Sequence, residues 1–336
     1  MILAGDIGGT KTLLAFLEVH DGKHVKFVGQ IQEYPSKQYA SFQAIVRKFK
    51  ETHPTPVEQA CFGMAGPNKE GKGEMTSLPQ WPIIDARAIA ADLHCEVHLI
   101  NDLEANAYGI DELGPDDLES VQDGAAGAVG NRAVISAGTG LGEAGLYWDG
   151  RRYIPFACEG GHTDFAPRNE LEIDLLRYLT KKFGHVSYER ILSGPGLVNV
   201  FNFLRETNRA KVPPELEKEL EGPEANRPRV ISKAGIKKRY DICVQALDIF
   251  VSLYGAEAGN LALKIMARGG VYVGGGIAPN ILEKIMEGEF KKQFLDKGRM
   301  GGKLLPQFPV QVIKNPNTAL LGAGRCAALK GGLIMI

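Results

Sequence analysis

Two glycine-rich segments of this sequence have residue types that suit a polyphosphate. The first is Gly5-Asp6-Ile7-Gly8-Gly9-Thr10, and the second is Gly138-Thr139-Gly140. Adjacent glycines can adopt positive φ and let backbone N–H groups approach an anion closely. In the first segment Thr10, Lys11 and Thr12 add hydroxyls and a positive charge. Each segment by itself is also compatible with an ordinary hairpin turn.

Neither segment matches a standard nucleotide-binding fingerprint. The first does not fit GxxxxGK[ST], and a strand pattern rather than a helix follows it. Gly140, Gly142 and Gly145 satisfy GxGxxG, but a strand and a turn follow them where a dinucleotide site needs a helix. A third run, Val273-Gly274-Gly275-Gly276, precedes a helix pattern and could pass beneath a nucleobase, although such runs are more often simple loops.

Polar side chains of a different kind follow the apolar run Val97 to Ile100. Asn101 and Asp102 stand where open α/β sheets place their ligands, at the carboxyl end of a strand. The alternative interpretation is that Asp102 only caps a helix over Glu104 to Tyr108.

A second polar cluster lies farther along the chain. Glu159, His162 and Asp164 fall within six residues around Gly160 and Gly161. Ionised carboxylates accept hydrogen bonds and an imidazole can donate or accept, so the cluster suits sugar hydroxyls. A metal site is less favoured, because neither a cysteine cluster nor a second histidine stands at ligand spacing. Glu189, before Ser193-Gly194-Pro195-Gly196, adds a carboxylate that could equally be a surface residue.

The predicted elements place these residues at strand ends. The first third of the chain alternates strand and helix patterns in the order βββαβαβ, and the opening hairpin pattern returns after residue 132. The two halves therefore look duplicated. The strands are predicted over 2–4, 12–17, 25–31, 60–64, 97–100, 133–137, 142–147, 153–157 and 271–273. One helix is predicted over Ser41 to Lys50, and a second begins after a cap at Asp85. A third is predicted over Asp241 to Arg268, and Gly269-Gly270 is expected to end it.

Two stretches carry no predicted chemistry. Asp111 to Gly124 is acidic and rich in turn residues, and Pro213 to Arg229 is charged with four prolines, so it is predicted to be a surface excursion.

Length and composition limit the classes of function. The 336 residues suggest two domains, and 39 basic against 40 acidic side chains give a net charge of −1. Such a balance disfavours nucleic acid and anionic membranes as partners, which leaves small molecules. The five scattered cysteines indicate neither disulfides nor a zinc site. The chain opens without a basic segment and has no long uncharged apolar run, so a cytoplasmic location is predicted.

The order of the motifs resembles that of the bacterial glucokinase family, within the superfamily of actin, sugar kinases and heat-shock ATPases. The resemblance covers essentially the whole chain. It rests on segments that run in the family's order: Ala4-Gly5-Asp6-Ile7-Gly8-Gly9-Thr10, Phe62-Gly63-Met64-Ala65-Gly66-Pro67, Ile100-Asn101-Asp102-Leu103-Glu104-Ala105-Asn106, Glu159-Gly160-Gly161-His162 and Asn315-Pro316-Asn317-Thr318-Ala319-Leu320-Leu321-Gly322.

The resemblance implies an α/β, two-domain actin/hexokinase-like (ribonuclease H-like) fold with duplicated βββαβα cores around an interdomain cleft. The expected small domain comprises residues 1–112 and 317–336, and the large domain 113–316. The implied activity is phosphorylation of glucose at its 6-hydroxyl by ATP with Mg²⁺, and the family's habit implies a homodimer.

Site residues are implied in the same way. Asp102 would be the base facing the 6-hydroxyl, and the other sugar hydroxyls would be held by Asn101, Glu159, His162 and Glu189. Asp6 would orient the magnesium through water. The ATP contacts would come from Gly5, Asp6, Ile7, Gly8, Gly9, Thr10, Gly138, Thr139, Gly140 and Gly275.

Some features leave alternatives open. The family commonly has Asn where this chain has Lys11, and Thr-Asn-Leu-Pro-Trp where it has Thr76-Ser77-Leu78-Pro79-Gln80-Trp81. A kinase for another hexose or an N-acetylhexosamine is the nearest alternative. A non-kinase actin-like ATPase would leave Glu159 and His162 without a role, and a sugar-sensing regulator would need a DNA-binding segment before the first strand.

Overall fold

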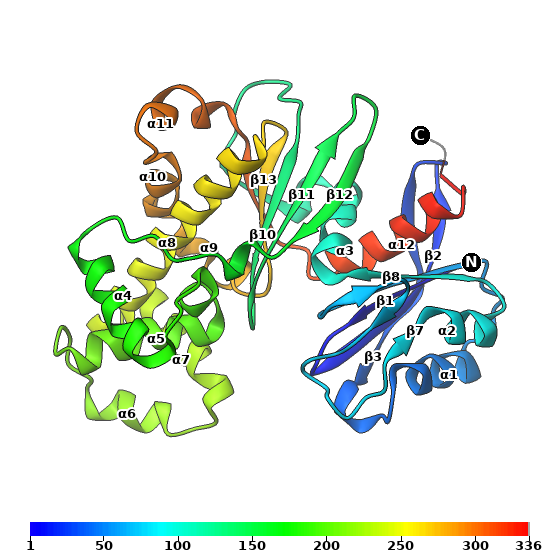
Figure 1. Cartoon of the computed structure of the whole chain (residues 1–336), viewed down its shortest axis with the longest axis horizontal. Coiled ribbons are helices and arrows are strands. Elements are labelled where there is room, and N and C mark those ends of the chain that lie inside the picture. Colours follow the sequence, from blue (N-terminus) through cyan, green and yellow to red (C-terminus); the bar gives the residue numbers. More distant parts are fainter. Residues whose placement is uncertain (335–336) are drawn as a thin grey trace. The chain divides into compact units, whose positions relative to one another are not determined.

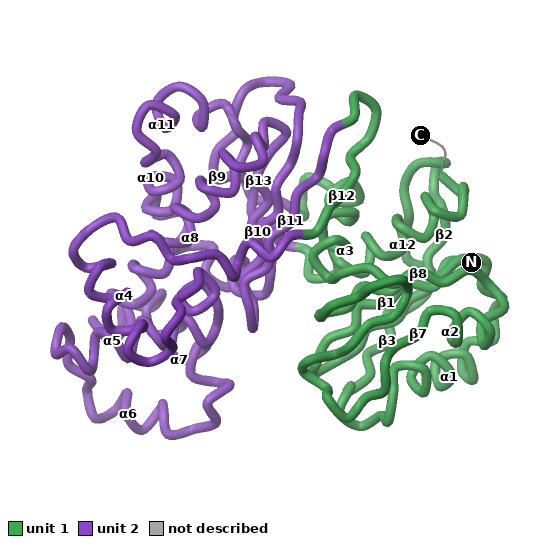
Figure 2. The backbone as a smooth tube through the Cα atoms, viewed as in Figure 1, with its two compact units in different colours: residues 1–117, 149–157, 315–336 green, residues 118–148, 158–314 purple. Residues whose placement is uncertain are grey.

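The computed structural model describes residues 1–334, and the chain divides into two compact units (Figure 2). Unit 1 comprises residues 1–117, 149–157 and 315–336, and unit 2 comprises residues 118–148 and 158–314. The domain limits expected from the sequence, at 112/113 and 316/317, remain a proposal.

Unit 1 is built on a five-stranded sheet with the order β3-β2-β1-β4-β8 (Figure 1). The first three strands are antiparallel, whereas β4 and β8 run parallel to β1. The strands are β1 (Ile2–Ile7), β2 (Lys11–His20), β3 (His24–Pro35), β4 (Gln59–Met64) and β8 (Glu96–Asn101). All five predicted strands are confirmed, each extended by a few residues.

Helices cover both faces of this sheet. Alternate residues of β1 point to opposite faces, so Leu3 and Ile7 pack with the buried face of α1 (Phe42–Thr52) while Ile2 and Ala4 pack with α12 (Thr318–Lys330). The helix α2 (Ala86–Leu93) lies with α1, and α3 (Asp102–Gly109) lies with α12. Asp85 caps α2 as predicted, and Ser41, predicted as the first helical residue, is the cap of α1; each accepts a hydrogen bond from a backbone N–H group.

The helices α3 and α12 cross at two glycines. A Cβ on Gly322 would lie 1.8 Å from the carbonyl oxygen of Ala105, and one on Gly109 would lie 2.1 Å from that of Thr318. Only glycine permits this approach of the two backbones. The C-terminal helix therefore packs directly against the helix that carries Asp102.

The second sheet repeats the strand order of the first. Its order is β12-β11-β10-β13-β14-β9, in which β11 is antiparallel to β10 while β13 and β14 run parallel to β10. The bounds are β9 (Leu118–Gln122), β10 (Arg132–Ala137), β11 (Leu141–Trp148), β12 (Tyr153–Cys158), β13 (Gly270–Gly274) and β14 (Val310–Ile313). The expected duplication is thus present in the topology, with β9 added at one edge.

Unit 2 has most of the helices, and α8 is its central one. Phe250, Tyr254 and Leu261 of α8 are buried against apolar residues of β10 and β13. The helices are α4 (Glu170–Phe183), α5 (Gly194–Glu206), α6 (Pro214–Leu220), α7 (Arg227–Ile236), α8 (Asp241–Ile265), α9 (Leu282–Met286), α10 (Glu289–Leu295) and α11 (Arg299–Lys303). By length and hydropathy α8 could span a membrane, but 72% of its most apolar window is buried within the protein.

Two predictions about local structure were wrong. The acidic stretch 111–124 contains β9, which pairs with β14 at the sheet edge. The helix α8 ends at Ile265, because Met266 takes a left-handed conformation (φ 54°) before the predicted Gly269-Gly270 closure. The stretch 213–229 is mostly exposed, as predicted for a surface excursion, and it contains α6, whose Leu216 is buried. A short sheet of β5 (Asn68–Lys69), β6 (Lys72–Gly73) and β7 (Ile84–Asp85) was not predicted.

Candidate active site

In unit 1, the first glycine hairpin and the Asn-Asp pair end at the same edge of the sheet. Ile7 is in register with Met64, and Met64 is in register with Asn101. Neighbouring strands lie about 4.8 Å apart, so the backbones at Ile7 and Asn101 are separated by about 10 Å. A phosphate chain held by the hairpin and an oxygen held by Asp102 can both be reached from this edge.

The first hairpin is held by a serine that the sequence analysis did not select. Ser36 donates from Oγ to the carbonyl oxygen of Gly8 at 2.7 Å, and its backbone N–H donates to the carbonyl oxygen of Thr10 at 3.0 Å. The Thr12 hydroxyl is buried and lies 3.0 Å from the Ser36 hydroxyl. Thr12 therefore anchors the hairpin, contrary to its predicted use toward phosphate, while Thr10 is exposed.

Gly8 and Gly9 lie where a side chain would collide with neighbouring atoms. Neither has positive φ, contrary to the conformational argument made from the sequence. A Cβ on Gly8 would lie 2.8 Å from the carbonyl oxygen of Lys11, and a Cβ on Gly9 would lie 2.4 Å from Oγ of Ser77. The hairpin is therefore a narrow backbone surface, and Ser77, one of the departures from the family pattern, lies against it.

Asp6 lies on β1 just before this hairpin. Burial raises the pKa of its carboxyl from 3.8 to about 6, and the positive charge of Lys11 partly opposes that rise. Lys11 itself is exposed and forms an ion pair with Glu33 at 2.9 Å. Asp6 thus presents a carboxyl whose charge is incompletely compensated by the protein.

The helix α3 begins at the Asn-Asp pair. The side-chain oxygen of Asn101 accepts a hydrogen bond from the backbone N–H of Leu103 at 2.8 Å, so Asn101 is the cap and Asp102 is the first helical residue. The alternative prediction, in which Asp102 is the capping residue, is therefore wrong. Oδ1 of Asp102 also accepts from Leu103, at 2.9 Å. The partial positive charge at the helix N-terminus stabilises the Asp102 carboxylate.

In unit 2, the second hairpin is closed by a glutamate from a distant segment. Gly138 N–H donates to the carbonyl oxygen of Gly140 at 2.8 Å, and Leu141 N–H donates to Oε2 of Glu189 at 3.1 Å. A Cβ on Gly140 would lie 2.5 Å from that same oxygen. The helix α5 also contacts the hairpin, since Gly194 N–H donates to the carbonyl oxygen of Gly138 at 2.8 Å.

The glycine-rich loop after β13 returns to the base of this hairpin. Gly275 has φ +81°, and a Cβ there would lie 2.3 Å from the carbonyl oxygen of Ala137. The buried hydroxyl of Tyr254 joins the two strand ends, because it accepts from Ala137 N–H at 3.3 Å and lies 3.3 Å from the carbonyl oxygen of Gly274. The expected nucleoside loop and the second hairpin therefore lie together at one sheet edge.

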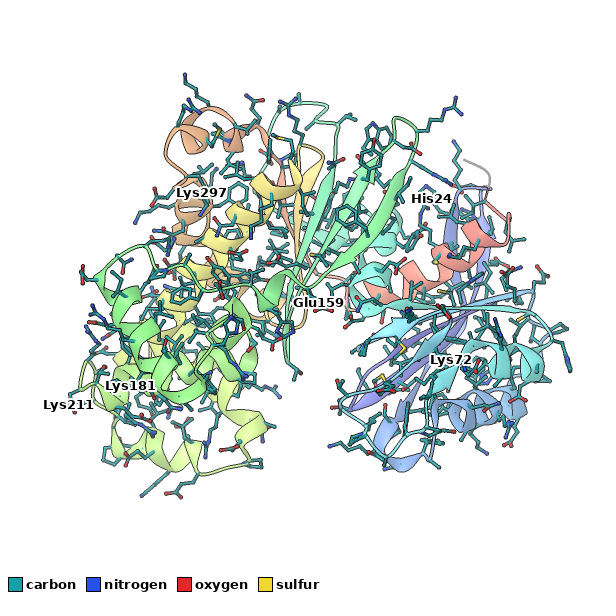
Figure 3. All side chains as sticks on the ribbon, viewed as in Figure 1. His24, Lys72, Glu159, Lys181, Lys211 and Lys297 are labelled. Atoms are coloured by element: carbon teal, nitrogen blue, oxygen red, sulfur yellow. The ribbon has the colours of Figure 1, made fainter. Side chains whose placement is uncertain are left out.

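Glu159 and His162 lie together at the end of β12, where Glu159 is labelled in Figure 3. Nε2 of His162 is 3.9 Å from Oε2 of Glu159, and the two side chains are 59% and 84% exposed, so both can reach a ligand. Asp164 does not join them, since one of its carboxylate oxygens bonds to Nε2 of His185 at 2.7 Å. The sequence cluster is thus reduced to two residues.

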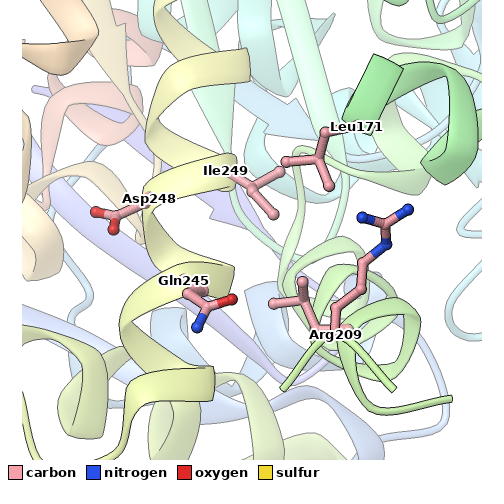
Figure 4. A pocket seen from close by; sticks show the side chains of 6 residues that line it. Leu171, Arg209, Gln245, Asp248 and Ile249 are labelled. Carbon is pink, nitrogen blue, oxygen red and sulfur yellow. The ribbon is translucent and has the colours of Figure 1, made fainter. Parts of the chain in front are cut away.

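A cavity of about 530 Å³ lies elsewhere in unit 2, among α4, α5 and α8 (Figure 4). Its lining side chains are Leu171, Leu204, Arg209, Gln245, Asp248 and Ile249. It contains none of the predicted site residues. The predicted site residues lie instead at an edge of the sheet in unit 1 and at an edge of the sheet in unit 2, as described above for each unit.

Comparisons with known proteins agree with these motifs. The family model described as Glucokinase matches residues 3–330. A glucokinase of Nostoc punctiforme is 40% identical over 98% of this chain and 99% of its own length. Among solved structures, a glucokinase from an Antarctic psychrotroph has a TM-score of 0.83 at 30% identity, covering 98% of both chains.

More distant structures share the fold. A ROK family glucokinase from Streptomyces griseus, solved with glucose and AMPPNP, has a TM-score of 0.64 at 19% identity over 98% of this chain and 99% of its own. The two sheets of matching strand order are the expected actin/hexokinase-like architecture. On the family match over residues 3–330 and the near-complete relatives, this chain belongs to the glucokinase family.

Proposed function

We propose that this protein phosphorylates D-glucose at the 6-hydroxyl, with ATP as the donor, to give glucose 6-phosphate. The observation that carries the proposal is the register of the unit 1 sheet, which brings the phosphate hairpin and Asp102 to one edge in a chain of this family. A phosphate-binding backbone beside a carboxylate is the arrangement that phosphoryl transfer to an alcohol needs.

Unit 1 supplies the reacting carboxylate and contacts to the outer phosphate. Gly8, Gly9 and Thr10 would contact the γ-phosphate through backbone N–H groups and one hydroxyl. Asp102 would accept a hydrogen bond from the 6-hydroxyl and aim its oxygen at phosphorus. Asn101 uses its oxygen to cap α3, so its amide N–H groups are the donors that can bind a sugar hydroxyl.

Unit 2 supplies the remaining contacts. Glu159 and His162 would bind sugar hydroxyls, as would the Glu189 oxygen that does not accept from Leu141. Gly138, Thr139 and Gly140 would hold the inner phosphates, and Gly275 would contact the nucleoside. In this assignment one carboxylate oxygen of Glu189 binds a sugar hydroxyl, and the other accepts from the backbone N–H of Leu141 at the phosphate hairpin.

Asp6 fits a magnesium ion held through water. Mg²⁺ in kinases is bound by one or two carboxylates together with substrate phosphates and waters, so a single acidic residue is sufficient. Burial raises the pKa of Asp6 although Lys11 opposes the rise, and a cation close to Asp6 would stabilise its charged form. Bound Mg²⁺ would neutralise charge on the phosphates of ATP.

Asp102 acts mainly by alignment. A free aspartate is a weak base toward an alcohol, so proton transfer to Asp102 comes late in the reaction. Phosphoryl transfer needs little covalent help from the protein and depends on holding the attacking oxygen in line with the leaving group. The hydrogen bonds that fix Asp102 at the start of α3 serve this purpose.

A coupled assay across hexoses and phosphoryl donors tests the proposed function. We expect turnover with glucose and ATP, detected as glucose 6-phosphate. Faster turnover with another hexose or with an N-acetylhexosamine would select the alternative kinase. Hydrolysis of ATP that no sugar accelerates would instead indicate a non-kinase ATPase. Turnover of sugar with ADP or polyphosphate but not with ATP would identify a different phosphoryl donor.

Gly63→Ala is expected to lower kcat on the order of tenfold or more. A Cβ on Gly63 would lie 2.8 Å from Cβ of Ala105 and 3.8 Å from Cα of Asp102, so the start of α3 must move away from the sheet. A misplacement of about 1 Å at a reacting group can cost about 10²-fold in rate. Gly222→Ala, where a Cβ meets nothing within 4 Å, is the control. Unchanged kcat in Gly63→Ala would contradict this role of Gly63.

Gly275→Ala is expected to raise KM for ATP by about tenfold, equivalent to about 1.4 kcal/mol, with little change in KM for glucose. Alanine is strained at φ +81°, and its Cβ would collide with the carbonyl of Ala137, so the loop must move. Gly276→Ala is a matched control one residue away, because its Cβ meets nothing within 4 Å. Equal ATP KM values in the two variants would contradict the nucleoside assignment.

The homodimer, the cytoplasmic location and the domain limits at 112/113 and 316/317 stay proposals. Size-exclusion chromatography with light scattering tests the homodimer, since its measured mass would be about twice the 36.4 kDa of one chain.

A further inference from the structure

Glu143 is a buried carboxyl directly beneath the segment that presents Glu159 and His162. It lies on β11, is 1% exposed, and its Oε1 is buried without a hydrogen-bond partner. An ionised carboxylate in such a position would lose its hydration without replacement. The family resemblance assigned no role to this residue, and the proposed mechanism does not use it.

The other oxygen of Glu143 supports the turn Gly160–His162. A Cβ on Gly160 would lie 1.8 Å from Oε2 of Glu143, so the backbone of Gly160 rests on this carboxyl. Gly161 packs equally closely on the same strand, since its Cβ would lie 2.0 Å from the carbonyl oxygen of Leu141. The turn that carries both candidate sugar ligands is therefore seated on the beginning of β11.

A second buried carboxylate disfavours charge on Glu143. Glu257 of α8 is fully buried, accepts from Nδ2 of Asn260 at 2.7 Å, and lies 3.4 Å from Nζ of Lys264. Burial, and to a smaller extent the charge of Glu257, raise the pKa of Glu143 to about 8, although the positive charge of Lys264 opposes the rise.

The titratable groups around Glu143 come from three directions. They are Glu257, Lys264 and Tyr254 on α8, Cys158 and Glu159 at the end of β12, and Tyr188, which interacts with Glu257 from the turn Tyr188–Arg190. The pKa values of Cys158, Tyr188 and Tyr254 are raised by burial, so these groups are uncharged near neutral pH. Lys264 is the one cation among them, and it is paired with Glu257.

We propose that Glu143, in its protonated form, is a positioning residue for glucose, because its neutral side chain supports the Gly160–Gly161 turn and keeps Glu159 and His162 in place. Ionisation of Glu143 in alkaline solution places a second negative charge beside Glu257 and beneath Gly160. The carboxylate then draws water, the turn lifts from β11, and glucose affinity falls while the chemical step in bound complexes is little changed. This inference rests on the proposed function.

The test compares the pH dependence of KM for glucose in the wild type and in Glu143→Gln. If only the protonated form binds glucose, the wild-type KM rises about tenfold from pH 7 to pH 9, because the competent fraction falls by that factor around a pKa of about 8. Gln has the same shape and no charge, so we expect KM within about twofold of the wild type at pH 7 and no such rise. Glu217→Gln, on the exposed side of α6, is the control and should keep the wild-type profile.

Glu257→Gln gives a second, independent readout. Without the Glu257 charge, Glu143 ionises more readily, so the rise in KM should begin at lower pH than in the wild type. Circular dichroism establishes that each variant is folded, and isothermal titration with glucose separates binding from turnover.

Distinct results separate this inference from the proposed function. A wild-type KM for glucose that stays flat from pH 7 to pH 9 overturns the inference even if no variant folds. An identical rise in the wild type and Glu143→Gln overturns it as well, although glucose phosphorylation would stand. Absence of any sugar phosphorylation by the wild type defeats the proposed function instead.

Discussion

Replacing Asp102 by asparagine should lower kcat on the order of 10² or more while KM for glucose changes by less than about threefold. The asparagine oxygen can still accept the hydrogen bond that Leu103 N–H donates to Oδ1 of Asp102, so the start of α3 keeps its geometry. What is lost is the negative charge that accepts the hydroxyl proton and orients the attacking oxygen. A coupled assay for glucose 6-phosphate, with glucose binding measured separately, gives both quantities.

A matched control for Asp102→Asn exists in the same unit. Asp85 is also a carboxylate at a helix N-terminus, where it accepts from Arg87 N–H at 2.9 Å, and asparagine caps helices equally well. Asp85→Asn should therefore leave kcat unchanged. If Asp102→Asn retains more than about a third of wild-type kcat, Asp102 is not the base.

Replacing Glu159 by glutamine should raise KM for glucose by about 10-fold to 10²-fold, with a smaller change in kcat and none in KM for ATP. Glu159 is exposed enough to bond sugar hydroxyls, and hydrogen bonds to a charged acceptor contribute about 1.5–3 kcal/mol. The amide retains one acceptor oxygen but replaces the other with donors and removes the charge. Initial rates across glucose concentrations at saturating ATP measure this effect.

Asp164→Asn is the control within the same segment. The sequence groups Asp164 with Glu159, whereas the structure engages its carboxylate with His185 at 2.7 Å. Its replacement should not change KM for glucose. A loss of glucose affinity as large as that in Glu159→Gln would mean that the segment responds to any charge removed from it, and the assignment of Glu159 to a sugar hydroxyl would fail.

The regular elements near the site were predictable because their signals are local. Short apolar runs gave β1 and β10, and the spacing of Phe42, Ile45, Val46 and Phe49 gave α1. The errors occurred where a tertiary contact overrides the local signal. The segment Leu118–Gln122 looks like an acidic loop, yet it forms β9 because β14 offers an open sheet edge. The prediction for α8 also failed at its end, since Met266 adopts a left-handed conformation and ends the helix before the Gly269-Gly270 pair is reached.

The residues that support the site were the hardest to foresee. Ser36 holds the first hairpin from 28 residues away, and Glu189 closes the second from a segment 48 residues beyond Leu141. No spacing rule connects such pairs, because the contacts arise only when the strands and turns pack. Glu143 looks like an ordinary polar residue on a strand, and only its burial beneath Gly160 distinguishes it.

The sequence by itself determined the family, the two hairpins, the Asn101-Asp102 pair and the Glu159–His162 segment, because each is a short run of residues whose chemistry depends on its immediate neighbours. Only the tertiary structure decided that Asn101 caps α3, that Thr12 faces Ser36, that Asp164 pairs with His185 and that Glu143 lies under the turn Gly160–His162. Those outcomes depend on which distant groups compete for the same hydrogen bond or the same buried space, and that competition is settled only when the chain is packed.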